Sequence, residues 1–230
     1  MKSSVKTAIS VLLLALCAVI VVLGTVVFYD RRYYIVSIGV IVLSLAAAFI
    51  SFEHRPQTTR RLIILAVLVA VAVAGRAAFY MLPQFKPCAA VIIVAGAVFG
   101  MEAGFVTGAL TGFLSNFIFG QGPWTPWQMF AFGAVGLLAG LIFDKMHVRP
   151  GRIQLAVFGF LSAAVVYGVI VDTYSVFSFV SDVSLTAVLS VYASGVVFNL
   201  IHGAATAFFL AVLGVPLIKK LDRLNMKYEI

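Results

Sequence analysis

The residues best suited to bind a ligand lie in a short polar and aromatic segment within a long stretch that carries no charge. Residues 120–128 read Gly-Gln-Gly-Pro-Trp-Thr-Pro-Trp-Gln, and the two prolines prevent a helix from continuing through them. In a membrane, such a break is tolerated where protein or a water-filled cavity surrounds it. Trp124 and Trp127 fit an interfacial aromatic belt, but the glycines, the prolines, Gln121 and Gln128 favour a ligand-facing loop. Aromatic faces and neutral amides suit a flat heteroaromatic or large neutral ligand.

Four further polar side chains interrupt apolar runs, where polar groups tend to mark function. Arg76 either snorkels to the outer interface or faces an anionic ligand. Asn116 lies near the same end of its span as Trp124. Asn199 and His202 are three residues apart, so they share a helix face and either line a site or bond to neighbouring helices. No second His or Cys stands at ligand spacing from His202, so no metal site is expected.

No catalytic constellation accompanies these residues. The sequence contains no Walker-type glycine loop, no HExxH or GxSxG motif, and no pair of carboxylates on one face within the membrane. We therefore expect a binding or transport protein without a cofactor, and not an enzyme. A stand-alone carrier or channel and a membrane-embedded transferase are the alternatives.

The composition predicts the elements that must position these residues. A hydrophobic content of 63%, a charged content of 10% and a mean hydropathy of +1.14 exclude an ordinary soluble domain. Thr125, Pro126 and Gln128 fit a capping box and predict the start of a helix. We predict an all-α integral membrane protein with about eight transmembrane helices, since a span needs roughly 20 apolar residues. The predicted spans are 7–28, 33–52, 62–81, 88–101, 103–119, 127–143, 153–171 and one within 185–218.

Charge predicts the orientation of these spans. With the N-terminus inside, most lysines and arginines fall in cytoplasmic segments, as the positive-inside rule requires. The segment 172–182 carries Asp172 and Asp182 but no cation, and is expected to be an outer loop. Both termini are then cytoplasmic.

Small residues form two stripes at four-residue spacing. Gly96, Gly100, Gly104, Gly108 and Gly112 run through the predicted hairpin of short helices, where internal packing is the favoured interpretation. Alanines mark one face of the predicted span 62–81 in the same way. These alanines are Ala66, Ala70, Ala74 and Ala78. Their small side chains suit internal packing and docking of a partner helix equally well.

Three blocks of the sequence carry a resemblance to a known family. They read Gly-Arg-Ala-Ala-Phe-Tyr-Met-Leu-Pro-Gln-Phe-Lys-Pro at 75–87, Ser-Asn-Phe at 115–117 followed by the segment 120–130, and Phe-Asn-Leu-Ile-His-Gly-Ala-Ala-Thr at 198–206. Across about 62–228 the chain resembles the S components of energy-coupling factor (ECF) vitamin transporters. The resemblance is closest to the branch associated with cobalamin and its precursors.

This resemblance implies the substrate-binding subunit of an ATP-driven importer in the bacterial plasma membrane. Its partners would be a transmembrane coupling subunit and two ATPase subunits, and Ala66, Ala70 and Ala74 would form the docking stripe. Residues 62–230 would form the six-helix core, with 1–61 adding two N-terminal helices. Cobalamin or a corrinoid precursor is the leading ligand. The expected contacts are Arg76, Tyr80, Asn116, Gln121, Trp124, Trp127, Gln128, Asn199 and His202.

Overall fold

The computed structural model of the chain describes residues 43, 59–144, 150–180 and 184–228. Within these ranges every regular element is a helix, as the composition predicts. The first two predicted spans, 7–28 and 33–52, lie outside the described residues apart from residue 43, so the count of eight is a prediction that these helices leave open. The division of the chain at residues 61 and 62 likewise stays a prediction.

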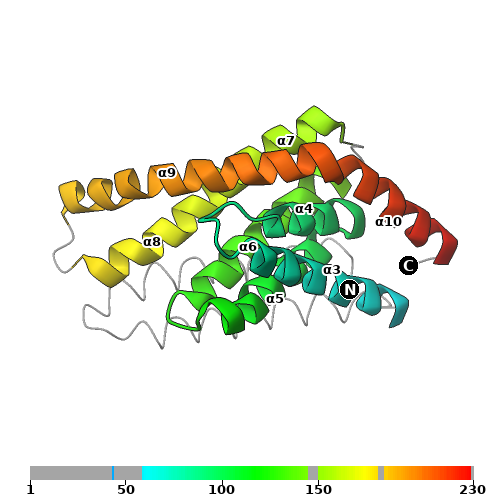
Figure 1. Cartoon of the computed structure of the whole chain (residues 1–230), viewed down its shortest axis with the longest axis horizontal. Coiled ribbons are helices and arrows are strands. Elements are labelled where there is room, and N and C mark those ends of the chain that lie inside the picture. The colour runs from blue at the N-terminus through cyan, green and yellow to red at the C-terminus, as the bar shows by residue number, and fades with distance from the viewer. Residues whose placement is uncertain (1–42, 44–58, 145–149, 181–183, 229–230) are drawn as a thin grey trace, which may run out of the picture.

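Six helical segments follow one another along the described chain (Figure 1). Two of them form a hairpin of short helices, and three include a π-helical stretch. In chain order the elements are α3 (Thr59–Ala78), α4 (Cys88–Phe99), α5 (Met101–Phe119), α6 with η1 (Thr125–Ala139 and Gly140–Asp144), α7, η2 and α8 (Arg152–Leu161, Ser162–Tyr167 and Gly168–Phe179), and α9, η3 and α10 (Leu185–Phe209, Leu210–Gly214 and Val215–Tyr228).

Four of the described helices are long and apolar enough to cross a membrane. They span Thr59–Ala78, Thr125–Asp144, Arg152–Phe179 and Leu185–Lys227, and Cys88–Phe99 is a shorter apolar helix. The predicted spans from residue 62 onward therefore locate the observed helices, with boundaries that differ by a few residues at most ends. The last two helices extend further than predicted.

The glycine stripe holds α4, α5 and α6 in close contact. Gly100 has a φ of 92°, a conformation that favours glycine, and it allows the sharp turn between α4 and α5. A Cβ atom added at Gly104 would overlap the backbone of Gly136, and one added at Gly136 would overlap the backbone of Gly104. Internal packing is therefore confirmed as the role of the glycines. Every residue of α4 is buried, among α3, α5, α6, α9 and α10.

Two local predictions are wrong. The predicted outer loop 172–182 begins inside a helix, because α8 continues to Phe179 and buries Asp172 against α9. The capping box at Thr125 does not form, and Trp124 takes the N-cap position without a side-chain hydrogen bond. The Thr125 hydroxyl instead donates to Gln121 and accepts from Asn116. These side-chain hydrogen bonds satisfy the buried hydroxyl as well as a bond to the helix backbone would.

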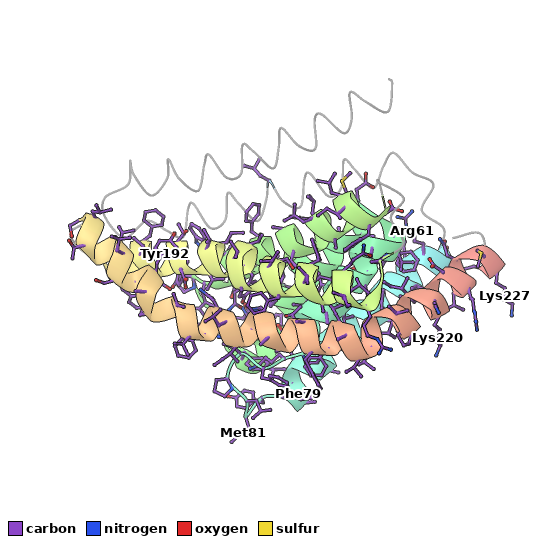
Figure 2. All side chains as sticks on the ribbon, turned by 90° about the horizontal axis from the view of Figure 1, so that it is seen from above. Arg61, Phe79, Met81, Tyr192, Lys220 and Lys227 are labelled. Atoms are coloured by element: carbon purple, nitrogen blue, oxygen red, sulfur yellow. The ribbon has the colours of Figure 1, made fainter. Side chains whose placement is uncertain are left out.

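The two ends of the helical assembly differ in charge. Figure 2 shows Arg61, Lys220 and Lys227 gathered at one end, whereas Tyr192 marks the opposite end, where α8 and α9 extend beyond the other helices. Phe79 and Met81 belong to the connection between α3 and α4, which projects from the side of the assembly. This connection, residues 79–87, is called the α3–α4 connection below.

Candidate functional site

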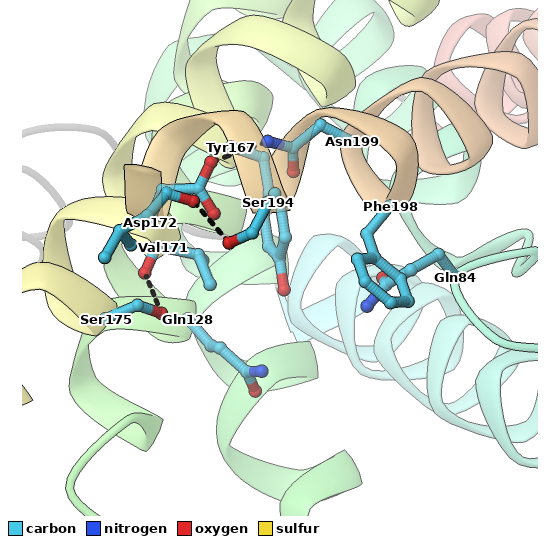
Figure 3. A pocket seen from close by; sticks show the side chains of 11 residues that line it. Gln84, Gln128, Tyr167, Val171, Asp172, Ser175, Ser194, Phe198 and Asn199 are labelled. Carbon is cyan, nitrogen blue, oxygen red and sulfur yellow. Dashed lines mark hydrogen bonds between the residues drawn. The ribbon is translucent and has the colours of Figure 1, made fainter. Parts of the chain in front are cut away.

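A cavity of about 300 Å³ lies between α6, η2, α8, α9 and the α3–α4 connection (Figure 3). Its volume is at the lower end of the range typical of small-molecule sites, roughly 300–1,000 Å³. Tyr167 and Phe198 supply aromatic rings. Amide, hydroxyl and carboxylate groups supply the polar part of the lining, from Gln84, Gln128, Asp172, Ser175, Ser194 and Asn199.

Asp172 and Asn199 form a polar pair between α8 and α9. The Asn199 side-chain amide donates to Oδ2 of Asp172 over 2.7 Å. Glycines face both groups: a Cβ atom on Gly195 would lie 2.6 Å from the Asp172 carboxylate oxygens, and one on Gly168 would lie 2.6 Å from the Asn199 amide carbon. The two helices can approach this closely with the pair between them because neither glycine has a side chain.

Arg76 is buried and does not snorkel to a membrane surface. Its Nη1 donates to the hydroxyl of Ser115 and, over 3.0 Å, to Oδ1 of Asn116. The guanidinium carbon also lies 4.5 Å from the ring centroid of Phe119 and 5.7 Å from that of Phe132. These contacts satisfy the charge through neutral dipoles and aromatic faces. Arg76 does not itself line the cavity.

Arg76 reaches the cavity through two amides. Asn116 uses its Nδ2 to donate to Oε1 of Gln128 over 2.9 Å and to the Thr125 hydroxyl over 3.1 Å. Because a guanidinium can only donate, it fixes the carbonyl of Asn116 toward itself, and Asn116 then fixes the carbonyl of Gln128. Gln128 lines the cavity, and its amino group remains available as a hydrogen-bond donor. We call Arg76, Asn116 and Gln128 the amide relay.

His202 lies behind the cavity wall. It is 3% exposed and packs its ring against Tyr167, at a centroid distance of 4.6 Å, and against Phe132. Tyr167 ends the π-helical stretch η2 and lines the cavity, whereas His202 does not. Of the two residues predicted to share a helix face, Asn199 therefore lines the cavity and His202 packs against Tyr167, whose ring does.

The loop predicted to face the ligand contributes to this cavity through Gln128 alone. Trp127 is buried against Tyr174 and Phe177, and Trp124 is 37% exposed with its ring over Gly122. Gln121 donates to the backbone of Phe113. Tyr80 packs on Phe119, with 5.0 Å between the ring centroids. None of the four predicted contacts Trp124, Trp127, Gln121 and Tyr80 lines the cavity.

From the sequence, most of the lining residues were missed and Asp172 was placed in a loop. The other missed residues are Gln84, Tyr167, Val171, Ser175, Val191, Ser194, Gly195 and Phe198. Polar residues within apolar helices were the available signal for Asp172, Ser175 and Ser194. Gln84 stands out only in the structure, where it lines the cavity and its φ of 56° places a non-glycine residue in the left-handed region. In the same connection, partial burial and the nearby Arg76 lower the pKa of Lys86.

Among the residues that the structure describes, no three His, Cys, Asp or Glu side chains gather in a way that could hold a metal ion. The amides, hydroxyls and aromatic rings that line the cavity can supply hydrogen bonds and aromatic contacts to an organic molecule.

Comparison with known proteins identifies the family. Residues 56–223 match the model of the ECF-type riboflavin transporter, S component. No curated protein and no solved structure matches the chain. The matched region includes every cavity residue and all helices from α3 to α9. The match confirms the ECF S component that the sequence blocks suggested, and it does not support the cobalamin branch. The chain belongs to the ECF-type riboflavin transporter S component family.

Proposed function

We propose that this S component binds riboflavin, or a closely related neutral flavin, in the cavity between α6, α8 and α9. As a member of its family, the chain is a substrate-binding membrane subunit of an ECF transporter and not an enzyme. The observation that carries the substrate proposal is the composition of the lining: amides and hydroxyls lie beside two aromatic rings, with no cation among the described lining residues. The match to the riboflavin-type family supports the same ligand.

A flavin offers the groups that this lining can recognise. Its planar ring system carries carbonyl acceptors and an N–H donor, and its side chain carries hydroxyls. The Gln128 amino group, oriented by the amide relay, is suited to a ring carbonyl. Ser175, Ser194 and Asp172 are suited to hydroxyls, and Tyr167 to aromatic contact. A corrinoid macrocycle is much larger than a cavity of about 300 Å³.

The orientation and the partners complete the proposal. The end that carries Arg61, Lys220 and Lys227 faces the cytoplasm, by the positive-inside rule. The cavity then opens toward the outer half of the membrane, where a vitamin arrives. Ala66, Ala70 and Ala74 are exposed on α3 and form the surface that docks to the transmembrane coupling subunit of the module with its two ATPases.

Titration of the purified full-length chain tests the ligand. Riboflavin fluorescence should be quenched on binding, because aromatic rings would contact the bound flavin. We expect saturable riboflavin binding at one site per chain and none with cobalamin, measured by displacement of bound riboflavin. Cobalamin binding without riboflavin binding would overturn the proposal and restore the corrinoid interpretation.

The amide relay gives a second prediction. Replacing Arg76 with Met should weaken riboflavin binding by roughly 10- to 100-fold, the range for losing a buried hydrogen-bond partner. The physical reason is that Asn116 and Gln128 lose their fixed orientation. Lys86→Met is the matched control, since Lys86 donates to the Leu82 carbonyl and does not line the cavity.

A double-mutant cycle separates the relay from a general packing role. If Arg76 acts through Gln128, the losses caused by Arg76→Met and Gln128→Leu should not add in the double variant. Strict additivity, or an equal loss in Lys86→Met, would contradict the relay.

A further inference from the structure

Among the residues that the structure describes, one formally charged side chain lines the cavity, and its charge is negative. Of the described lining residues, only Asp172 is ionisable near neutral pH, and no lysine, arginine or histidine is among them. Asp172 is 9% exposed, and its Oδ2 accepts from Asn199. The Oδ1 atom has no hydrogen bond within the described part of the chain, so it can accept from a ligand.

The two cations on neighbouring elements, Arg76 and Lys86, form their hydrogen bonds with groups outside the cavity lining. Arg76 donates to Ser115 and Asn116, and its hydrogen bonds reach the cavity lining only through the neutral amides of Asn116 and Gln128. Lys86 donates to the backbone of Leu82 and lies 5.4 Å from the ring centroid of Phe119. Neither group is placed to pair with an anion inside the cavity, and in the described residues no cation forms a salt bridge with Asp172.

We propose that Asp172 is a specificity-determining residue that makes this cavity select a dephosphorylated flavin over its phosphate ester. The inference rests on the proposed function, because it assumes that the ligand is a flavin. A hydroxyl of the neutral ligand donates to the free oxygen of Asp172. A phosphate at the end of the same side chain brings negative charge into a poorly hydrated cavity that already holds a carboxylate, and like charges brought together there repel strongly.

A purely structural role for Asp172 makes a different prediction. As a clamp between α8 and α9, the side chain needs only an oxygen that accepts from Asn199. Asparagine keeps such an oxygen and nearly the same shape, so Asp172→Asn preserves the clamp while removing the charge. Selectivity between the two ligands then changes only if the charge is what sets it.

The experiment measures riboflavin and flavin mononucleotide affinities on the purified full-length chain. For the unmodified protein we expect flavin mononucleotide to bind roughly 100-fold more weakly than riboflavin, the scale of a like-charge contact. In Asp172→Asn this ratio should fall to roughly tenfold or less. Glu102→Gln is the control for net charge, because Glu102 lies at the start of α5 and does not line the cavity.

A second variant keeps the test independent of Asp172 itself. Ser194→Lys adds a cation to the lining beside Asp172 and should also lower the ratio (Figure 3). Equal affinities in the unmodified protein would overturn the inference while leaving the flavin site intact. An affinity ratio between riboflavin and flavin mononucleotide that stays unchanged in both Asp172→Asn and Ser194→Lys would also overturn the inference while leaving the flavin site intact. If the unmodified protein binds neither flavin, the proposed function itself fails.

Discussion

Replacing Gly136 with Val should prevent the chain from folding into its compact helical assembly. The backbones of α5 and α6 touch at Gly104 and Gly136, so a side chain at either position must force the two helices apart. Because α4 packs against both helices, this separation would also open the contacts of the most buried helix. Overpacking in a well-packed core costs about 1–3 kcal/mol where side chains can adjust, and here the obstacle is backbone. Size-exclusion profile and thermal unfolding of the purified protein measure the effect.

Gly151→Ser provides the matched control for this prediction. A Cβ atom at Gly151 would meet only Oε1 of Gln154, at 3.6 Å, which is an ordinary contact. Gly151 is the N-cap of α7, a position that serine favours. We expect Gly136→Ala to be intermediate between the control and Gly136→Val. An unfolding temperature for Gly136→Val close to that of the unmodified protein would show that α5 and α6 do not approach at this point.

The helices could be predicted because a helix that crosses a membrane requires a long run of apolar residues, which is easy to recognise in a sequence. Apolar runs of the right length located every described helix, and the four-residue glycine spacing correctly predicted close internal packing, which the structure shows between α5 and α6. The lengths of the last two segments were harder to predict. The long segment Arg152–Phe179 continues past Asp172, and a carboxylate in an apolar run looks like the start of a loop when its partner is unknown. That partner, Asn199, lies on the next helix.

The cavity was only partly predictable for a related reason. Gln128 and Asn199 were expected to contact the ligand and do line the cavity, since amides in apolar helices are conspicuous. Arg76 and Asn116 were expected there too, but Asn116 lies one hydrogen bond away from the lining residue Gln128, and Arg76 lies two away. Trp124 and Trp127 were predicted to contact the ligand because of their residue type. The direction of a tryptophan side chain, however, depends on how the helices pack, which the residue type does not show. Tyr167 and Phe198 carry no sequence signal that separates them from core aromatics.

The proposed docking role of the alanine stripe predicts the largest functional effect. Ala66, Ala70 and Ala74 are exposed on α3, on the side opposite buried residues such as Leu65 and Leu68. Small residues permit close approach of helix backbones in lipid, and a smooth surface suits a partner that must also dissociate. We expect Ala70→Trp to reduce riboflavin uptake by cells that carry the whole transporter to background. Binding to the purified subunit should stay within about twofold, because Ala70 does not line the cavity.

The comparison of uptake with binding decides what the stripe does. Ile153→Trp adds the same bulk at a position on α7 that is 78% exposed, and it should leave both uptake and binding intact. Co-purification of the subunit with its coupling partners adds a direct readout, and Ala70→Trp should abolish it while Ile153→Trp preserves it. A parallel loss of binding and thermal stability in Ala70→Trp would mean that another part of this chain covers the stripe. Internal packing would then be its role, and the docking surface would have to lie on a different helix.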